Sequence, residues 1–159
     1  MDEEESPLKL SDFAVSEAVE ETAESFRDFA RSQGHPLELA IVPGLTYCGD
    51  EYAVRQLVSI LLDNAARYAA PGAPILLSLQ KARRGVVLRE RNDCEGPDPA
   101  VLDRLFDRFY RPDEARSAAG GGFGIGLSIA RSIAEGHRGS IRAKSADDGR
   151  AIEFIAELK

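Results

Sequence analysis

Apolar residues recur every three or four positions in three stretches of the chain, and this spacing predicts three long helices. The first runs from residue 12 to about 31, with Ser11 or Asp12 available as its N-cap. The second covers 51–69, and the third runs from Ile125 to about Glu135. Their apolar stripes are Val15, Val19, Ala23, Phe26 and Ala30; Val54, Leu57, Val58, Leu61, Leu62 and Ala65; and Ile125, Ile129 and Ile133.

Shorter apolar runs between these helices predict strands. Residues 37–42 and 45–48, separated by Pro43-Gly44, form two strands or a strand and an extended segment. Residues 75–80 and 86–91 form neighbouring strands joined by a hairpin turn at 83–85. Residues 140–145 and 151–158 are the last strands, and alternation in 151–158 indicates one buried face. The expected fold class is therefore α/β, a two-layer sandwich with helices on one face of a mixed sheet.

A different pattern occupies the stretch between the hairpin and the third helix. Asp98 followed by Pro99 is a good N-cap and first-turn pair, which predicts a short helix. Its apolar residues would be Val101, Leu102, Leu105, Phe106 and Phe109. Residues 111–122 follow as a polar loop that ends in glycines.

Composition narrows the class of protein. The chain has 159 residues, of which 43% are hydrophobic, which suits one globular domain. A net charge of -7 and a pI near 4.9 argue against nucleic acid or an anionic membrane surface as a main partner. No apolar run approaches the roughly 20 residues that span a bilayer. We expect 1–10 to be an acidic leader or boundary, and 11–159 to be one cytoplasmic domain with no membrane contact of its own.

Two cysteines are present, Cys48 and Cys94, without a CxxC spacing and with too few histidines for a zinc set. A disulfide framework and a structural metal are therefore not expected, and the two residues are interpreted as reduced thiols.

A glycine run marks the point where the polar loop becomes the third helix. Gly120, Gly121, Gly122, Gly124 and Gly126 remove side chains there and leave backbone N–H groups at the positive end of the helix dipole. Such a place binds phosphate. The alternative interpretation of this run by itself is a flexible linker that ends in a helix.

Polar residues on the second helix offer further ligand contacts. Ile60, Asn64 and Arg67 lie at i, i+4 and i+7 and share one face. Asn64 carries a carbonyl oxygen that suits a hard cation such as magnesium, and Arg67 can reach a phosphate oxygen. Taken alone, this face could equally be a solvated polar edge. Arg108, Arg111 and Arg116 form a basic set just ahead of the glycines and could balance nucleotide charge.

Taken in order, these motifs resemble a known family. LLDNAARYA (61–69), the Gly96 region, FDRFYR (106–111), GGGFGIGLSIA (120–130) and EGHRGSI (135–141) are similar to the N, G1, F and G2 boxes of sensor histidine kinases. These boxes belong to the catalytic, ATP-binding domain, one of the Bergerat-fold (GHKL) ATPases. The resemblance covers nearly the whole chain.

The resemblance implies roles for individual residues. Asn64 would be the magnesium ligand, Arg67 would contact phosphate, and Tyr68 would border the adenine or ribose of ATP. Arg111 and Arg116 would hold the γ-phosphate from a mobile ATP lid at 111–122. The remaining contacts to the nucleotide would come from Asn92, Gly96, Arg108, Gly122, Gly124, Gly126 and Leu127.

Five residues depart from the family pattern. Asn92 stands where the family has the aspartate that accepts a hydrogen bond from the adenine amino group, and Cys94 stands at the place of a glycine. Losing the charge at Asn92 is expected to cost about 1 to 2 kcal/mol of ATP binding. Ile60 can be neither base nor metal ligand, so simple ATP hydrolysis is not expected. The last strand also carries Ala151 and Ile152 in place of a glycine-threonine pair.

The implied activity is transfer of the γ-phosphoryl group of Mg-ATP to a histidine outside this chain, for relay to a response regulator. His35 and His137 are the only histidines, and both are interpreted as structural. The substrate histidine would lie on a dimerising helical domain that precedes Met1 in a parent protein with a possible membrane anchor. A second hypothesis is a degenerate domain that acts as a regulatory protein-interaction module. A third, less favoured because of FDRFYR and the long arginine-bearing loop, is a serine kinase of the anti-sigma type.

Overall fold

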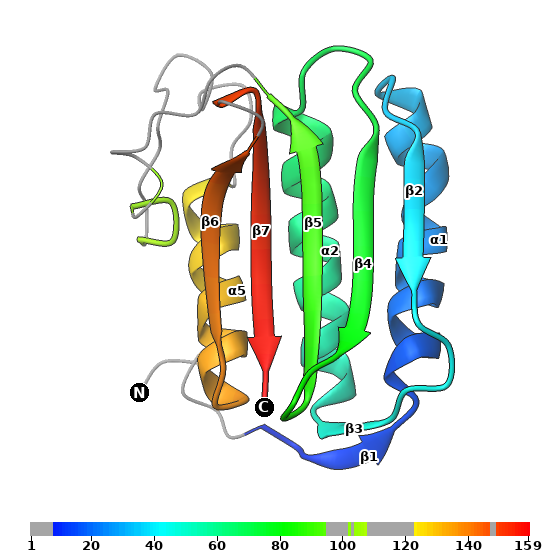
Figure 1. Ribbon diagram of the computed structural model, residues 1–159, viewed down its shortest axis with the longest axis vertical. Helices are drawn as coiled ribbons and strands as arrows, with labels where there is room; N and C mark the ends of the chain where they lie inside the picture. Colours follow the sequence, from blue (N-terminus) through cyan, green and yellow to red (C-terminus); the bar gives the residue numbers. More distant parts are fainter. Residues whose placement is uncertain (1–7, 95–101, 103, 108–122, 147–148) are drawn as a thin grey trace.

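A five-stranded mixed sheet forms one layer of the protein, seen in a computed structural model that describes residues 8–94, 102, 104–107, 123–146 and 149–159 (Figure 1). The strands lie in the order β2 (Leu37–Ile41), β4 (Ile75–Lys81), β5 (Val86–Asp93), β7 (Ala151–Leu158) and β6 (Ser140–Ala146). β2 and β4 are parallel, and the other pairs are antiparallel.

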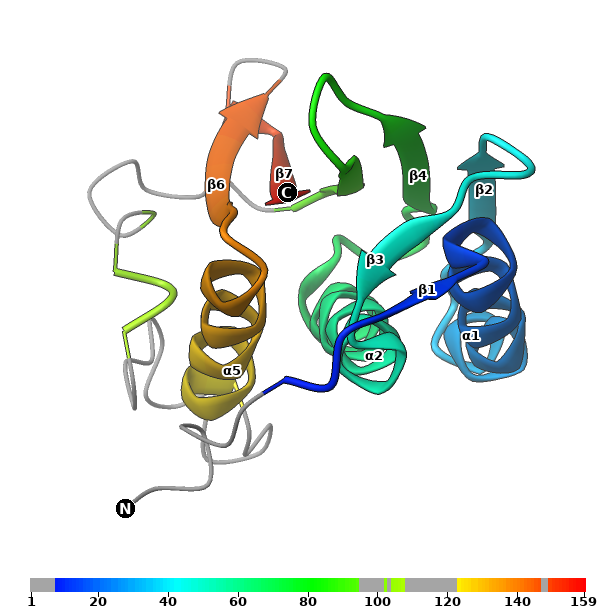
Figure 2. The same ribbon diagram turned by 90° about the horizontal axis from the view of Figure 1, so that it is seen from below.

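Helices α1 (Val15–Ser32), α2 (Glu51–Tyr68) and α5 (Phe123–Gly136) form the second layer. Figure 2 shows all three on the same side of the sheet, and none of the described helices covers the other side. The core lies between the layers, where the stripes predicted for α1 and α2 meet the inward residues of β4, β5 and β7. The expected two-layer α/β sandwich is therefore confirmed, as is the β4–β5 hairpin.

The predicted start of the first helix was wrong. Ser11 and Asp12 lie in a short strand, β1 (Ser11–Phe13), which pairs with β3 (Tyr47–Gly49) in a separate two-stranded sheet. Ala14 occupies the N-cap position and makes no side-chain hydrogen bond. Phe13 stays extended because its ring packs edge-on against Tyr47, with 6.2 Å between the ring centroids. The segment after Pro43-Gly44 is thus a strand, at 47–49 and not 45–48.

Two histidines are structural, as expected. His35 is buried, with Nδ1 at 2.8 Å from the carbonyl oxygen of Ala73. Nε2 of buried His137 accepts the backbone N–H of Asp50 at 3.0 Å, and its Nδ1 therefore carries the proton and donates to the carbonyl of Ile133 at 2.8 Å. His137 thus joins the end of α5 to the start of α2.

The chain leaves α5 through a left-handed residue that is not glycine. Arg138 has φ 62°, a conformation that costs an L-residue about 1–2 kcal/mol. We expect Arg138→Gly to raise the free energy of unfolding by about 1 kcal/mol in chemical denaturation. Arg138→Ala keeps the Cβ and should show no such gain. An equal gain in both variants would mean that the guanidinium, and not the backbone, is the source of strain.

Candidate functional site

The end of α2 and the end of β5 are tied together, and this tie positions the site. The backbone N–H of Ala70, two residues beyond α2, donates to the carbonyl of Asp93, the last residue of β5, at 2.8 Å. α2 is anchored at its other end by Asp50, whose carboxylate accepts the N–H of Ala53 at 3.1 Å. Its leucine-rich stripe packs against the sheet, so the C-terminal turns of α2 lie over the end of β5.

Asn64 lies in these last turns with only 7% of its surface exposed. Its Oδ1 is buried and has no hydrogen-bond partner among the described residues. A buried amide oxygen normally has a partner, because leaving it bare costs about 1–3 kcal/mol. The carbonyl oxygen of an asparagine is a ligand that Mg²⁺ accepts, so Asn64 fits a hard cation as the sequence predicts.

Asn92 presents a second bare oxygen at the end of β5. Its Nδ2 donates to the carbonyl of Asp93 at 3.0 Å, which leaves Oδ1 as the free end of the amide. This Oδ1 is buried and has no partner among the described residues. Its cross-strand neighbours are Ile75 and Ile152, which carry no polar side-chain atoms. Asn92 can therefore accept a hydrogen bond from a ligand, as an aspartate would, but without the charge.

The start of α5 faces the same part of α2. The helix begins at Phe123, two residues earlier than predicted, so Gly124 is among the first residues, whose backbone N–H groups have no helical partner, and Gly126 closes the first turn. A Cβ built on Gly126 would lie 3.7 Å from Cγ2 of Ile60, one turn before Asn64, which is an ordinary contact. Packing against the described residues does not require a glycine at 126. Because Gly126 has no side chain, a ligand can approach the backbone of α5 closely at this position beside α2.

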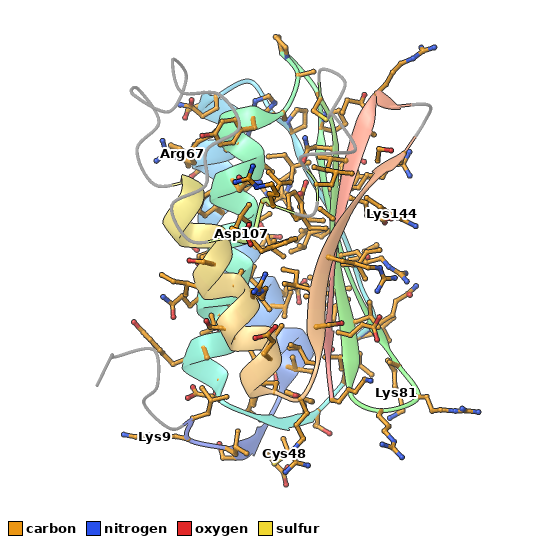
Figure 3. The ribbon with its side chains drawn as sticks, turned by 90° about the vertical axis from the view of Figure 1, so that its left-hand side faces the viewer. Lys9, Cys48, Arg67, Lys81, Asp107 and Lys144 are labelled. Carbon is orange, nitrogen blue, oxygen red and sulfur yellow. The ribbon has the colours of Figure 1, made fainter. Side chains whose placement is uncertain are left out.

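Arg67 and Tyr68 complete the described part of the site. Arg67 donates from Nε to Asp63 at 3.0 Å, and its side chain is 42% exposed. Figure 3 shows Arg67 at the end of the molecule where α2 and β5 end. Tyr68 is partly buried and packs against the core. Both residues thus follow Asn64 within four positions along the helix, at the end of α2 where the candidate site lies.

The comparisons with known proteins give this arrangement a family. A family model described as histidine kinase-, DNA gyrase B- and HSP90-like ATPase matches residues 49–159. The chain belongs to this ATPase family. The match spans α2, β5 and α5, the three elements that carry the candidate site.

Curated relatives of this ATPase domain are sensor kinases. The sensor protein DltS of Streptococcus agalactiae is 34% identical over 96% of this chain. The histidine-protein kinase BaeS and the sensor histidine kinase CusS of Escherichia coli are 33% and 39% identical over 84% and 69% of it. The chain spans 38%, 28% and 22% of the lengths of these proteins.

Solved structures show the same fold. The histidine kinase ThkA catalytic domain aligns with a TM-score of 0.77 at 19% identity, covering 95% of this chain and 97% of that one. A mycobacterial sensor histidine kinase, MprB, aligns with a TM-score of 0.75 at 24% identity, covering 95% and 99%. The expected Bergerat-type fold is confirmed. The chain is an ATPase domain of the type found in sensor histidine kinases.

The F box of this ATPase domain is anchored in the core. Leu105 and Phe106 are buried, and the ring of Phe106 packs edge-on against Phe154 of β7 at 6.0 Å. Asp107 lies 3.9 Å from the guanidinium of Arg131 on α5. Of the predicted short helix, the structure describes residues 102 and 104–107; residue 102 is helical, 104–106 form a turn and 107 lies in a bend. Phe106 and Asp107, the first two residues of FDRFYR, therefore connect the sheet and α5.

Several predicted site residues lie outside the described residues: Gly96, Arg108, Arg111, Arg116 and Gly122. Leu127 is described, and its side chain is 1% exposed within the core. The residue therefore packs in the core, with almost none of its surface open to a nucleotide. Among the described residues, no three His, Cys, Asp or Glu side chains are grouped to hold a metal ion.

Cys94 and Cys48 are free thiols. Cys94 follows β5, and its N–H donates to the carbonyl of Arg150 at 2.9 Å. Burial, and then the charges of Asp93 and Glu90, raises the pKa of the Cys94 thiol. A raised pKa disfavours the thiolate, which agrees with an unreactive side chain.

Sequence reasoning missed Glu90 on β5. This residue is fully buried, and neither carboxylate oxygen has a partner among the described residues. Burial, and to a lesser degree the charge of Glu153, raises the pKa of Glu90 well above its ordinary value. The signal was present in the alternation of Val86, Leu88, Glu90 and Asn92, which places all four on the same face of the strand.

Proposed function

We propose that this domain binds Mg-ATP and transfers its γ-phosphoryl group to a histidine on another domain of the parent protein. The observation that carries the proposal is Asn64. Its buried, unpartnered Oδ1 lies one turn beyond the contact between Ile60 and the glycine-bearing start of α5. A carbonyl ligand for a cation beside free helix N–H groups is what a metal-bound polyphosphate needs.

Each side chain then has a role. Asn64 would hold Mg²⁺, which neutralises phosphate charge when bound. Arg67 would contact a phosphate oxygen, Tyr68 would border the adenine or ribose, and Asn92 would accept a hydrogen bond from the adenine amino group. Gly124 would offer its backbone N–H to the triphosphate, and Gly126 would leave room for the phosphates beside it. Gly96, Gly122, Leu127, Arg108, Arg111 and Arg116 keep the roles that the resemblance implies, with 111–122 as the lid.

Transfer depends on positioning and charge neutralisation more than on a base in the protein. Ile60 offers no base beside Asn64, so water activation is not expected from this position. The acceptor is a histidine outside 11–159, because His35 and His137 are both buried and hydrogen-bonded within the fold. We propose a dimerising helical domain of the same protein as its location, and an aspartate of a response regulator as the next acceptor.

The relatives support the proposal that this domain is part of a longer sensor protein. They are sensor proteins and sensor histidine kinases of which this chain spans only a part. The parent protein is thus proposed to be a two-component sensor, with this domain in the cytoplasm. None of the described helices is long and apolar enough to cross a membrane.

Asn92 and Ile60 together favour a second candidate function, a degenerate module that has lost useful ATP affinity and acts through protein contacts. Calorimetry of ATP binding, with and without magnesium, separates the two. We expect this chain to bind Mg-ATP and Asn92→Asp to bind it about tenfold more tightly, because a charged acceptor strengthens the bond to the amino group. No detectable binding to this chain at millimolar ATP, together with binding to Asn92→Asp, would favour the degenerate module.

Gly126→Ala separates packing from ligand contact. The added Cβ fits against Ile60, and alanine in place of glycine favours the helix by up to about 1 kcal/mol. We therefore expect a protein that is at least as stable but binds ATP about tenfold more weakly, because the methyl group occupies the approach to the first-turn N–H groups. Adenosine, which has no phosphates, serves as the control ligand and should bind both proteins equally. An equal loss for adenosine would place the triphosphate elsewhere.

A further inference from the structure

The inward face of the central strands is apolar except at two adjacent places. Glu90 and Asn92 point toward the helices from β5, two residues apart. Figure 3 shows a layer of side chains between the sheet and the helices. The surrounding inward residues of β4, β5 and β7 are Ile75, Leu77, Leu79, Val86, Leu88, Ile152, Phe154, Ala156 and Leu158.

Glu90 is costly for folding. Its cross-strand neighbours are Leu77 and Phe154, which offer no hydrogen-bonding side chain. A buried polar group without a partner costs about 1–3 kcal/mol, and a charged one costs more. An apolar residue of similar size would fill this position without that penalty. Packing therefore gives no reason for a carboxyl group here, and a ligand contact does.

The bare polar atoms are confined to one place. In the described part of the chain, the buried side-chain oxygens and nitrogens without a partner belong to three residues, Asn64, Glu90 and Asn92. The hydrogen bond between Ala70 and Asp93 gives a common reference point for α2 and β5. Asn64 precedes Ala70 by six residues, which is about 9 Å along a helix, and Glu90 precedes Asp93 by three residues, which is about 10 Å along a strand. Glu90 is thus level with Asn64 and next to Asn92, on the inner side of the candidate nucleotide site.

We propose that Glu90 is a base-recognition residue that, together with Asn92, binds the amino edge of adenine, directly or through one ordered water. This inference rests on the proposed ATP binding. Position 92 carries an amide where the family has a carboxyl group. Glu90, two residues earlier on the same face of β5, would supply a carboxyl group in its place.

The chemistry of the pair matches adenine. Burial favours the neutral carboxyl, which carries one O–H donor and one carbonyl acceptor. Adenine offers an amino group as donor beside a ring nitrogen as acceptor, so the acid can serve both. Asn92 Oδ1 accepts the second amino hydrogen. Guanine carries a carbonyl oxygen in place of the amino group, and this oxygen would face Asn92 Oδ1, acceptor against acceptor. The pair therefore favours adenine over guanine.

The test compares Glu90→Leu with Glu90→Gln in the same chain by calorimetry with ATP and with inorganic tripolyphosphate. Glutamine keeps one donor and one acceptor, so its ATP affinity should stay within about threefold of the unsubstituted chain. Leucine keeps the volume and removes both groups, so ATP affinity should fall about tenfold. Affinity for tripolyphosphate, which has no base, should not change in either variant. Leu88→Val, on the same face, controls for a general disturbance of the core and should leave ATP affinity unchanged.

The outcomes separate this inference from the proposed function. If the unsubstituted chain and Glu90→Leu bind ATP equally, Glu90 has no part in base recognition while the proposed function stands. Base recognition by Glu90 is also excluded if Glu90→Leu weakens the binding of ATP and of tripolyphosphate to the same extent. If the unsubstituted chain binds neither ATP nor tripolyphosphate, the proposed function fails, and the base-recognition role fails with it.

Discussion

Replacing Asn64 by alanine is expected to abolish the magnesium dependence of ATP binding and to weaken binding in magnesium by about 10- to 100-fold. The reason is the position of Oδ1, which is buried, unpartnered among the described residues and one turn beyond the contact between α2 and α5. Calorimetric titration of ATP with and without magnesium measures both quantities. The fold should survive, because alanine is the better helix former and the bare amide contributes no hydrogen bond through Oδ1.

Asn64→Asp is the matched control. It keeps an oxygen at the same place and adds a charge that favours a cation, so magnesium dependence should persist. The sharpest contradiction would be an Asn64→Ala protein whose ATP affinity still depends on magnesium. The metal ligand would then lie elsewhere, and the roles of Arg67 and Tyr68, which the family resemblance implies from the same motif, would have to be revised with it.

The long elements could be predicted because burial imposes a period on them. The stripe of α2, from Val54 to Ala65, is buried as its spacing indicated. In β7 the expected inward residues Phe154, Ala156 and Leu158 are buried, but Ala151 and Ile155 on the other face are buried as well. The short β1–β3 pair escaped prediction because three residues are too few to show a period. Its stability comes from a tertiary contact, Phe13 against Tyr47, that local sequence does not reveal. Ser11 and Asp12 resembled an N-cap for the same reason.

Some residues of the candidate site could likewise be predicted from the sequence, and Glu90 could not. Asn64 and Gly126 were identified because family motifs and helical spacing indicate them, and both lie where α2 and α5 meet. Glu90 was missed because the run VVLRERND carries charges on both faces of the strand, at Arg89, Glu90 and Arg91. Glutamate is rarely buried without a partner, so sequence alone favours a solvated side chain. Only the three-dimensional packing of Leu77 and Phe154 around it shows its burial.

A second large effect is expected on stability, and it also concerns Glu90. Burial, and then the charge of Glu153, raises the pKa of Glu90 well above 4.5 in the folded chain. The folded state therefore binds the proton more tightly than the unfolded state, and the free energy of unfolding falls as pH rises above about 4.5. Glu90→Leu removes this loss. We expect it to raise the free energy of unfolding by about 1–3 kcal/mol at pH 8, measured by urea denaturation without nucleotide.

The pH profile is the discriminating measurement, because a better-packed core would give the same gain at every pH. The gain from Glu90→Leu should shrink as pH falls toward 4.5, where the native carboxyl is protonated in both states. The cross-strand neighbours of Glu90 on β4 and β7 are Leu77 and Phe154, and neither titrates; the described titratable groups that interact with it through charge are Glu153 and Cys94. Glu153 lies on the opposite face of the sheet, 3.5 Å from Lys144, so Glu153→Gln should leave most of the pH dependence in place.

A gain that is constant between pH 5 and 8 would show that Glu90 ionises as readily in the folded chain as in the unfolded one. A gain that grows with pH, together with weaker ATP binding, would show a carboxyl group retained at a cost to folding for the sake of the nucleotide.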